Sequence, residues 1–379
     1  MNTWRILITP LYWGLGHATR CMPIIDELLA HHIEVFIGSD GEALNLLQET
    51  YPNCTCIPLP AYNIHYKSEN MIFNLAKQSF HILTTMGKER LKIANIIEKH
   101  KINLLITDNR FGAYSTKIPT VFITHQLHIR VPNTILSKFV ATFNNSIIKK
   151  YTQCWVPDLP DNYFNLSGDL SHPNSLFNNI KYIGALSRLK SFDHEKLEYI
   201  TSSLIFKNLF FGKGTMVLVL LSGPEPQRTY LEEKLLTQAK QIKDKNFLFV
   251  RGVVIGEKNQ WTIVEENIYI ANYLQGEMLS AIIQKADFLV SRSGYSTIMD
   301  YYQLQKKNIL FIPTPGQTEQ EYLAEILSAK NICAMQTQKH IHLENDLKTA
   351  AKTKGFQEEN LSIFSYQTHI LPLLERRTF

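Results

Sequence analysis

Hydrophobic residues in this chain gather in short uninterrupted runs, and longer segments with helical spacing lie between the runs. Such runs cover residues 4–9, 33–37 and 102–106 in the first half, and residues 216–221 and 288–290 in the second. Apolar runs of this length without polar alternation predict strands that are buried on both faces of a parallel sheet. Apolar residues that recur every three or four positions between the runs predict crossover helices. The pattern therefore favours an α/β protein built from βαβ units.

The same alternation occurs twice along the chain, which predicts two domains. The chain has 379 residues, enough for two domains of ordinary size. We expect a first domain at residues 1–185, a second domain at residues 186–358, and a final amphipathic helix within residues 359–379. Hydrophobic residues make up 45% of the chain and charged residues 19%, which is typical of a globular α/β protein.

The loop after the first expected strand carries the first candidate site. Gly14 and Gly16 permit a tight turn and a close approach of the backbone to a ligand. His17 follows them at the start of a helix, and a neutral imidazole there can take a proton from a hydroxyl group at physiological pH. We therefore predict that His17 is a catalytic base; the alternative is a histidine that is bonded locally at a helix start. Arg20 lies one helical turn further and faces either the same cleft or solvent.

Polar residues also follow two later strands of the first domain. These residues are Asp108, Asn109 and Arg110 after the strand at 102–106, and His125 and Gln126 after the strand at 120–124. Polar groups just past the carboxyl ends of parallel strands line the usual ligand crevice of an open α/β sheet. A carboxylate bonded to one ring nitrogen of a histidine fixes its tautomer and stabilises the imidazolium. We therefore predict a pair between His17 and Asp108, with a simple turn cap at Asp108 as the alternative.

The second domain opens with a strand at residues 216–221, and the loop after this strand suits a phosphate. Gly223 lets the backbone approach a ligand, and Arg228 lies near the start of the next helix. An arginine together with the N–H groups of a helix N-terminus can hold a diphosphate. The donor-side candidates in this loop are Ser222, Gly223, Gln227, Arg228 and Thr229. The alternative is an ordinary turn stiffened by its prolines.

A second polar turn follows the strand at residues 288–290. A helix begins near Ser296, and Asp300 lies about one turn inside it, where a carboxylate can accept bonds from ribose hydroxyls while phosphates sit at the helix tip. The candidates here are Arg292, Ser293, Gly294, Ser296, Thr297 and Asp300, and Gln320 and Glu321 follow the next strand. Tyr273, after the strand at 268–270, either stacks on a base or packs in the core.

The segment from Arg292 to Asp300, with its Arg-Ser-Gly triplet, its threonine and its acid, resembles the donor domain of GT-B glycosyltransferases. The resemblance is nearest to glycosyltransferase family 28, which includes the N-acetylglucosaminyltransferase of peptidoglycan synthesis. The loop from Gly14 to His17 resembles the first loop of the same transferases. The resemblance implies a GT-B fold, with two Rossmann-like parallel-sheet domains that face a central cleft and a last helix that returns to the first domain.

The resemblance also implies roles for single residues. In family 28 a glutamate of this segment holds the ribose, and Asp300 stands in its place. A Gln-Gln-Tyr segment contacts the sugar hydroxyls in that family, and the matching residues here are Gln320, Glu321 and Tyr322. Arg188 matches an arginine that reaches the nucleotide side of the cleft. The first-domain candidates around His17 would then face the acceptor.

From these features and the resemblance, we expect an inverting glycosyltransferase of the hexosyltransferase type. It would move a sugar from a nucleotide sugar, with UDP as the expected carrier, to an acceptor hydroxyl in cell-surface glycan or glycolipid synthesis. The acceptor would be a glycan, a lipid-linked saccharide or a small molecule. The sequence has no Asp-x-Asp motif, so we expect a metal-independent reaction with no cofactor. Two alternatives share the architecture: a UDP-sugar 2-epimerase, which Glu319 and Glu321 would serve, and a non-catalytic nucleotide-sugar-binding protein.

Charge and cysteine content bear on the partners and the location. The net charge of +5 and the pI near 8.7 suit an anionic small ligand or an acidic membrane surface. No block of lysine and arginine with interleaved aromatic residues is present, so we expect no nucleic acid partner. Five scattered cysteines indicate a reducing compartment, and we find neither a signal peptide nor an apolar run of the ~20 residues that a membrane span needs. We expect a cytoplasmic protein, with peripheral contact of the basic segment at 127–151 to the inner face of a membrane as one option.

Overall fold

The computed structural model places most of the chain in two compact units. The described residues are 4–62, 71–129, 134–160, 165–173, 178–200, 214–223, 225–253, 261–274, 276–356 and 364–375. The first unit holds Met1–Arg188 together with Leu361–Phe379, and the second unit holds Leu189–Asn360. Each unit contains one sheet with helices packed on it, which confirms the predicted α/β class.

The first unit is built on a seven-stranded sheet with the order β3-β2-β1-β4-β5-β6-β7. Its strands are β1 (Arg5–Pro10), β2 (Glu34–Ser39), β3 (Thr55–Pro58), β4 (Leu104–Asp108), β5 (Thr120–Ile123), β6 (Gln153–Val156) and β7 (Ile180–Tyr182). All neighbouring strands are parallel. The strand order reverses between β1 and β4, and a reversal of this kind opens a ligand crevice at the carboxyl ends of the two strands.

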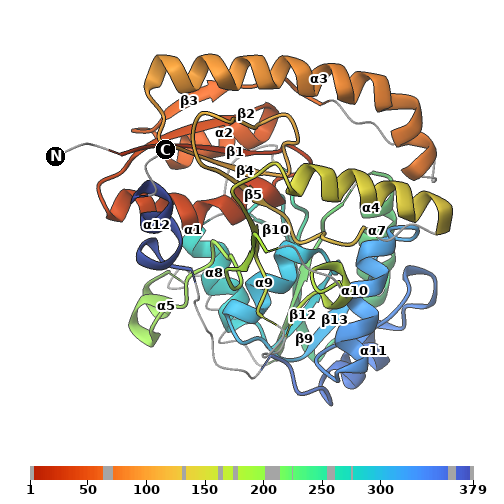
Figure 1. The fold of residues 1–379 in the computed structure, drawn as a ribbon. Coiled ribbons are helices and arrows are strands. Elements are labelled where there is room, and N and C mark those ends of the chain that lie inside the picture. The colour runs from red at the N-terminus through yellow and green to blue at the C-terminus, as the bar shows by residue number, and fades with distance from the viewer. Residues whose placement is uncertain are drawn as a thin grey trace. The chain divides into compact units, whose positions relative to one another are not determined.

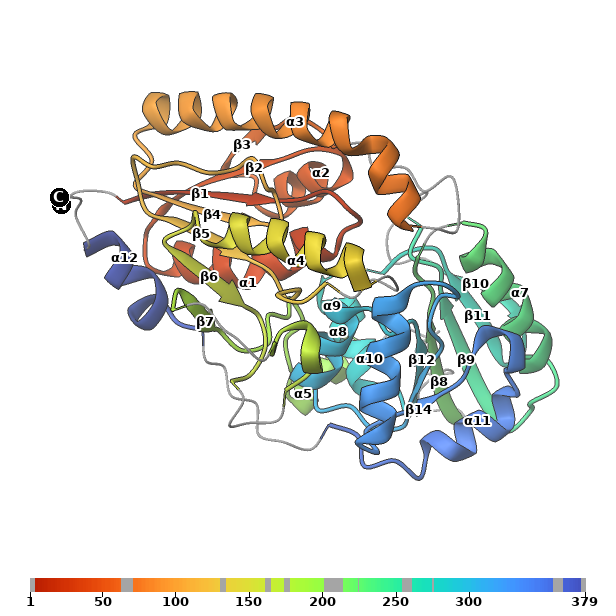
Figure 2. The same cartoon turned by 45° about the vertical axis from the view of Figure 1, so that its right-hand side comes forward.

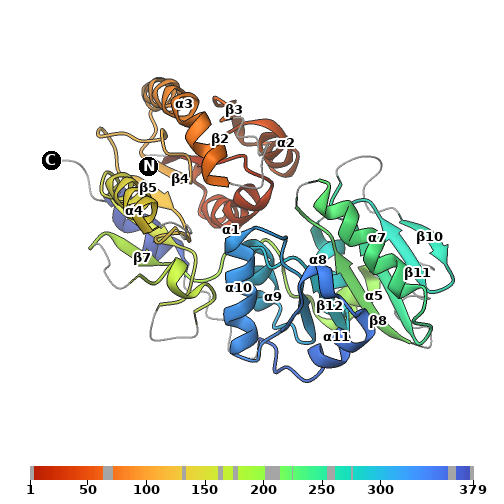
Figure 3. The same cartoon turned by 90° about the vertical axis from the view of Figure 1, so that its right-hand side faces the viewer.

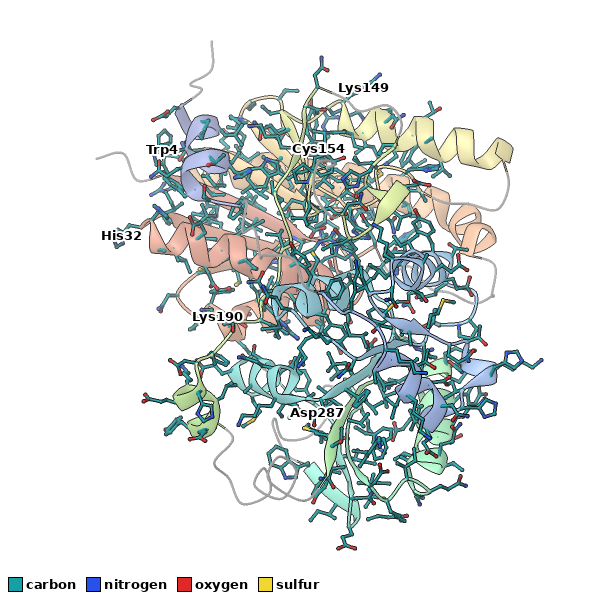
Figure 4. All side chains as sticks on the ribbon, turned by 90° about the horizontal axis from the view of Figure 1, so that it is seen from below. Trp4, His32, Lys149, Cys154, Lys190 and Asp287 are labelled. Carbon is teal, nitrogen blue, oxygen red and sulfur yellow. The ribbon has the colours of Figure 1, made fainter. Side chains whose placement is uncertain are left out.

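Helices cover both faces of the first sheet. They are α1 (Gly16–Ala30), α2 (Gly41–Thr50), α3 (Met71–His100) and α4 (Thr134–Ile148), with a short 3-10 turn at Gly168–Leu170. Ile93 and Ile97 of α3 pack with Leu105 of β4 in one core cluster, and α1 lies on the opposite side of the strands (Figure 1). Cys154 of β6 lies inside the unit, whereas Lys149 points outward (Figure 4). α3 has 30 residues and is the longest of these described helices.

The second unit has a seven-stranded sheet with the order β10-β11-β9-β8-β12-β13-β14. Its strands are β8 (Thr215–Leu220), β9 (Lys245–Val250), β10 (Trp261–Glu265), β11 (Ile268–Ala271), β12 (Phe288–Ser291), β13 (Ile309–Phe311) and β14 (Ala334–Met335). Neighbouring strands are parallel except β10, which runs antiparallel to β11 at the edge. Here the order reverses between β8 and β12, so the loops after these two strands flank the crevice.

The helices of the second unit follow its strands in turn. They are α5 (His194–Ile200), α7 (Gln227–Ala239), α8 (Gly276–Lys285), α9 (Tyr295–Gln303), α10 (Thr318–Ala329) and α11 (Leu343–Ala350), with a 3-10 turn at Gln338–His340. α7 and α11 lie side by side over one face of the sheet (Figure 3), where Leu235 and Leu347 join Val219 in the core. α9 follows β12 and α10 follows β13 (Figure 2), which places both helix starts at the carboxyl end of the sheet. Among the described helices of both units, none is long and apolar enough to cross a membrane.

The C-terminal segment packs on the first unit. It forms a π-helical turn at Tyr366–Ile370 and the short helix α12 (Leu371–Glu375). The backbone N–H of Tyr366 donates to Oε1 of Glu27 on α1 at 2.9 Å, and the Tyr366 ring stacks on His31 with 4.3 Å between centroids. The first residues of the expected final helix, up to residue 363, lie outside the described part of the chain.

Candidate active site

His17 lies in the first turn of α1, directly after the loop that leaves β1. Gly14 in this loop has φ of +79°, a left-handed conformation that favours glycine. The His17 side chain is 13% exposed, and its Nδ1 lies 2.9 Å from Oδ1 of Asp108. Asp108 is wholly buried at the end of β4, in register with Pro10 of β1. The structure therefore brings together the two residues of the predicted pair.

Arg20, one turn along α1, joins this pair from inside the unit. It is 2% exposed, so the solvent-facing alternative for this residue is wrong. Its Nε and Nη2 donate to the two oxygens of Asp108, a forked contact typical of strong arginine–carboxylate pairs. Its Nη2 also lies 2.8 Å from Nδ1 of His17, and its Nη1 lies 3.0 Å from Nδ1 of His125. We call His17, Arg20, Asp108 and His125 the His17 cluster.

Burial and Arg20 together set the charges in the His17 cluster. Burial by itself would raise the pKa of the Asp108 carboxyl, but the charges and hydrogen bonds of Arg20 and His17 outweigh burial and hold this pKa below its usual value. Burial lowers the pKa of His17; Asp108 opposes this effect, while Arg20 and His125 add to it. At neutral pH the cluster therefore contains a charged Arg20–Asp108 pair and a neutral His17, which is the form that a base requires.

Asn109 and Gln126 lie beside the cluster, in the loops that follow β4 and β5. Both side chains are half-buried. Asn109 has φ of +56°, and its N–H donates to the carbonyl of Ile123 at 3.3 Å. The N–H of Gln126 donates to Oγ1 of Thr124 at 3.1 Å. Their places at the carboxyl edge of the sheet match those expected for acceptor-side residues.

Arg110 follows the same strand, but its side chain is enclosed inside the unit. Its guanidinium is wholly buried, and its Nη1 donates to Oδ1 of Asp40 at 2.5 Å. Its Nε donates to Glu89 of α3, and its Nη2 donates to the carbonyl of Pro60 at 2.5 Å. Two buried carboxylates thus hold this cation inside the first unit. The expectation that Arg110 lines the cleft is therefore corrected: it ties the loop after β4 to α3 and to the start of α2.

In the second unit, Arg292 follows β12 and turns inward. It is 1% exposed, and its Nη1 donates to the carbonyls of Ile312 and Pro313 at 3.0 and 2.9 Å. Its Nη2 donates to the carbonyl of Gln227 at 3.0 Å and to Oε1 of Gln338 at 2.7 Å. The expected direct contact between this side chain and a donor is therefore corrected. Arg292 braces the loops after β12 and β13 against the start of α7.

None of the hydrogen-bond partners of Arg292 in the described part of the chain is a carboxylate. All four acceptors are neutral oxygens, and Nε has no partner in the described part of the chain. Burial lowers the pKa of Arg292 to about 10, so the guanidinium is still charged at neutral pH. Thr314 directly follows Pro313, whose carbonyl accepts from Arg292. The hydroxyl of Thr314 is buried and likewise has no described partner, and it lies 3.5 Å from the point where a Cβ on Gly223 would stand. The loops after β8 and β13 therefore enclose groups that suit an anion.

A carboxylate of the chain itself engages the start of α7. Glu225 accepts from Nε of Arg228 at 3.0 Å and also from Nη2 of this side chain. Its other oxygen accepts from the N–H and the hydroxyl of Thr229 at 3.2 and 2.8 Å. Ser222 and Gly223 are exposed, and Gly223 has φ of +99°. These groups were predicted to hold a diphosphate, and Glu225 was not among the candidates, although an acidic residue near a helix N-terminus interacts favourably with the helix dipole.

The N-terminus of α9 lies directly after the turn that leaves β12. Gly294 is the N-cap residue and makes no side-chain capping bond. Ser296 and Thr297 are half-buried in the first turn, and Asp300 is half-buried one turn further on. The segment thus places a helix N-terminus before a carboxylate, in the order expected for a diphosphate and a ribose.

The side chains expected to hold the sugar anchor the loop before α10. The N–H of Thr314 donates to Oε1 of Gln320 at 2.9 Å, and the N–H of Gly316 donates to Oε1 of Glu321 at 3.1 Å. The hydroxyl of Ser293 is buried and donates to the carbonyl of Gln320 at 2.6 Å. A donor contact through the Ser293 hydroxyl is therefore corrected, since this group holds α10. Gln320 and Glu321 keep a half-buried position at the carboxyl edge of the sheet.

Three further candidates have different surroundings. Oε1 of Gln227 accepts from Nε2 of Gln338 at 3.0 Å, so Gln227 belongs to the brace around Arg292. Tyr273 is 8% exposed, which favours the alternative of core packing. Arg188 is half-buried and is the last residue of its segment in the first unit.

Comparison with known proteins links both units to sugar transfer. Residues 226–369 match the model of the glycosyltransferase family 28 C-terminal domain. An uncharacterized glycosyltransferase of Methanosarcina acetivorans is 25% identical over 336 residues, which cover 85% of this chain and 81% of that protein. A UDP-N-acetylglucosamine--N-acetylmuramyl-(pentapeptide) pyrophosphoryl-undecaprenol N-acetylglucosamine transferase of Prochlorococcus marinus is 24% identical over 261 residues, covering 67% of this chain and 63% of that enzyme.

Solved structures support the same assignment at the level of the fold. The glycotransferase of kitacinnamycin superposes with a TM-score of 0.61 at 15% identity, covering 93% of this chain and 91% of that one. The predicted GT-B fold is thereby confirmed. The chain is accordingly a glycosyltransferase of the GT-B fold, similar to glycosyltransferase family 28.

Proposed function

We propose that this chain is an inverting, metal-independent transferase that moves a sugar from a UDP-sugar to an acceptor hydroxyl. The observation that carries the proposal is the His17 cluster, in which a neutral and largely buried imidazole is held against an ionised aspartate. A base in this state, at the carboxyl end of the first sheet, is suited to activate a hydroxyl group.

In the proposed reaction, the acceptor hydroxyl gives its proton to Nε2 of His17 while its oxygen bonds to the anomeric carbon. The bond between this carbon and the diphosphate oxygen breaks on the opposite face of the sugar, and the electron pair leaves with UDP. Attack and departure on opposite faces invert the anomeric centre. The carboxylate of Asp108 stabilises the imidazolium that forms.

The second unit would supply the charge that the leaving diphosphate needs. Arg292 has no carboxylate among its described hydrogen-bond partners, Arg228 lies in the first turn of α7, and α9 begins after Gly294 at the carboxyl end of β12. Fixed positive groups and N–H dipoles of this kind stabilise a departing diphosphate and can replace a metal ion. We infer that the phosphates bind at the loops after β8 and β12, and that Asp300 accepts bonds from the ribose.

The donor and acceptor classes rest on the relatives. The Prochlorococcus enzyme carries UDP-N-acetylglucosamine and a lipid-linked saccharide in its name, which supports a UDP-sugar donor and a glycan or lipid-linked acceptor here. All five cysteines are free, which suits a reducing compartment, and we place the reaction on the cytoplasmic side with peripheral contact to the membrane. The location and the membrane contact belong to the proposal.

The test is UDP release from a panel of UDP-sugars, measured with and without extracts that contain lipid-linked and free saccharides. We expect release that depends on an acceptor and is unaffected by a metal chelator. His17→Ala should lower turnover by about 10²- to 10⁴-fold, because general base catalysis contributes on this order. His81→Ala, an exposed histidine of the same unit, is the matched control. Isomerisation of the sugar without an acceptor, or full turnover in His17→Ala, would overturn the proposal.

A further inference from the structure

Arg20 contacts three side chains of the His17 cluster at once. Its Nε and Nη2 donate to Asp108, its Nη1 lies 3.0 Å from Nδ1 of His125, and its Nη2 lies 2.8 Å from Nδ1 of His17. A guanidinium has only N–H groups to offer and accepts no hydrogen bond. Arg20 therefore constrains where the protons of its neighbours can lie.

The proton position follows directly at His125. Its Nδ1 faces the Nη1 of Arg20 at 3.0 Å, so this ring nitrogen acts as the acceptor. A nitrogen that accepts carries no proton of its own, and in a neutral imidazole the proton then lies on the other nitrogen. His125 is thus held as the tautomer with its proton on Nε2.

At His17 two neighbours compete for the same ring nitrogen. Nδ1 lies 2.9 Å from Oδ1 of Asp108 and 2.8 Å from Nη2 of Arg20. The carboxylate spreads its charge over two oxygens and the guanidinium spreads its charge over three nitrogens, so the carboxylate oxygen acts more strongly at similar distances. The Nη2 of Arg20 also donates to that same oxygen. Nδ1 of His17 therefore carries the proton and donates to Asp108, which leaves the lone pair on Nε2.

We propose that the His17 cluster holds its two histidines in opposite tautomers: Asp108 keeps His17 with a basic Nε2, and Arg20 is the positioning residue that keeps His125 with a protonated Nε2. The inference rests on the proposed function only where it makes His17 the base. The arrangement gives the cluster a single base, so the proton of an acceptor hydroxyl has one destination. The groups that face His17 are Arg20 of α1, Asp108 of β4 and His125 after β5, and the thiol of Cys21 lies 3.8 Å from Asp108.

The direct test is nitrogen NMR of the ligand-free full chain with isotope-labelled histidine. The chain has 13 histidines, and His17→Ala and His125→Ala each remove one set of signals and so assign the two rings. We expect an unprotonated Nε2 and a protonated Nδ1 for His17, and the reverse for His125. The same tautomer on both rings, or a proton on Nδ1 of His125, would overturn the proposal.

Substitutions of Arg20 separate positioning from support of the fold. Arg20→Met removes a charge that lowers the pKa of His17, so the titration midpoint of His17 should rise. Arg20→Lys keeps the charge but cannot form the fork and the third contact, so the signals of His125 should shift towards a mixture of tautomers. Arg5→Met, which removes a half-exposed pair with Glu34 in the same unit, should change neither.

Two outcomes count against Arg20. A rise or fall of Tm in Arg20→Met with an unchanged His17 midpoint would show a purely structural role. If Arg20→Met does not fold, Arg20→Lys provides the test. Unchanged nitrogen signals of His125 in that variant would likewise show that the role of Arg20 is purely structural. Because these readouts need no turnover, they fail separately from the proposed function. The expected tautomers together with an active His17→Ala variant would contradict the catalytic role of His17 alone.

Discussion

Arg20 of the first unit and Arg292 of the second are both buried near the carboxyl ends of the central strands of their sheets, and the two arginines have different partners. Arg20 of the first unit forms a fork with the carboxylate of Asp108. Arg292 of the second unit is bonded only to neutral carbonyl and amide oxygens, and its Nε is unpaired among the described residues. A buried charge without a counter-charge is costly, and such a site is stabilised by an anion that binds to it.

The difference explains how one fold can serve two tasks. In the first unit burial lowers the pKa of His17 and the charges of Asp108 and Arg20 act on it in opposite directions, so the neutral imidazole is suited to the role of a base. In the second unit no carboxylate of the described residues neutralises Arg292 directly, so under the proposed function its charge would act on the diphosphate without direct contact. Arg110 shows the third case, a buried arginine bonded to two carboxylates, which we assign to the fold. The surroundings of a buried arginine, more than its place after a strand, thus indicate its role.

The largest effect that would sharpen this contrast is expected for Asp108→Asn. The variant removes the charge that stabilises the imidazolium, so turnover should fall by about 10²- to 10⁴-fold. UDP affinity should stay close to that of the parent chain, because the nucleotide groups lie in the second unit. Kinetics and UDP titration on the folded variant check this, with Glu34→Gln of the exposed Arg5 pair as the control. A loss of UDP affinity as large as the loss of turnover would break the division between the units.

The next effect concerns the unpaired charge of the second unit. Arg292→Met should weaken UDP binding by on the order of tenfold, since one charge acting across a partly screened distance is worth one or two kcal/mol. Binding of uridine, which carries no phosphate, should change much less. Titrations with both ligands check this, and Arg251→Met, which removes a half-exposed pair with Glu232, is the control. Equal losses for uridine and UDP would show that Arg292 only braces the loops.

The pH dependence of kcat/KM tests the neutral state of His17. Burial lowers the pKa of His17, so the base stays unprotonated below the ordinary histidine value of about 6.5. The acidic limb of the profile should therefore lie below pH ~6.5, with activity lost as the pH falls through the lowered pKa. In Asp108→Asn the limb should move lower still, because Asp108 raises the pKa of His17. An acidic limb above the ordinary value would contradict the neutral cluster.

The smallest effect is a gain in binding. Glu225 occupies the N–H and hydroxyl of Thr229 and the guanidinium of Arg228, all groups that we assign to the diphosphate. Glu225→Gln removes a negative charge at a helix start and should strengthen UDP binding by about two- to fivefold at low salt. The gain should shrink at high ionic strength, since exposed charges are screened. UDP titration at two salt concentrations checks this, and a lower affinity at both would show that Glu225 does not compete with the ligand.

The sequence predicts most of the framework and the meeting of His17 with Asp108, because both residues follow buried strands of one parallel sheet. Strand ends of this kind lie at one edge whatever the distance along the chain. The edge strand β10 could not be predicted in this way. Its residues Ile263 and Val264 are exposed, so its apolar residues do not indicate a buried face. The edge strand is held instead by its antiparallel pairing with β11.

The directions of the arginine side chains could not be predicted in the same way. Arg110 turns inward because Asp40 and Glu89, both remote in sequence, are buried beside it. Arg292 turns inward because the carbonyls of the β13 loop and of α7 converge on it. Such convergence depends on the packing of several elements and leaves no local pattern in the chain. Sequence position therefore indicates which loops form the site, and packing determines which side chains are available to a ligand.

The most direct test of the central claim is a crossed measurement on His17→Ala and Arg292→Met, with turnover and UDP affinity determined for both. We predict that His17→Ala loses turnover and keeps its UDP affinity, because the base lies in the first unit and the diphosphate groups in the second. Arg292→Met should lose UDP affinity and, with saturating donor, should keep a turnover that is lowered by less than in His17→Ala. Loss of UDP affinity in His17→Ala to the same extent as its turnover would contradict the account.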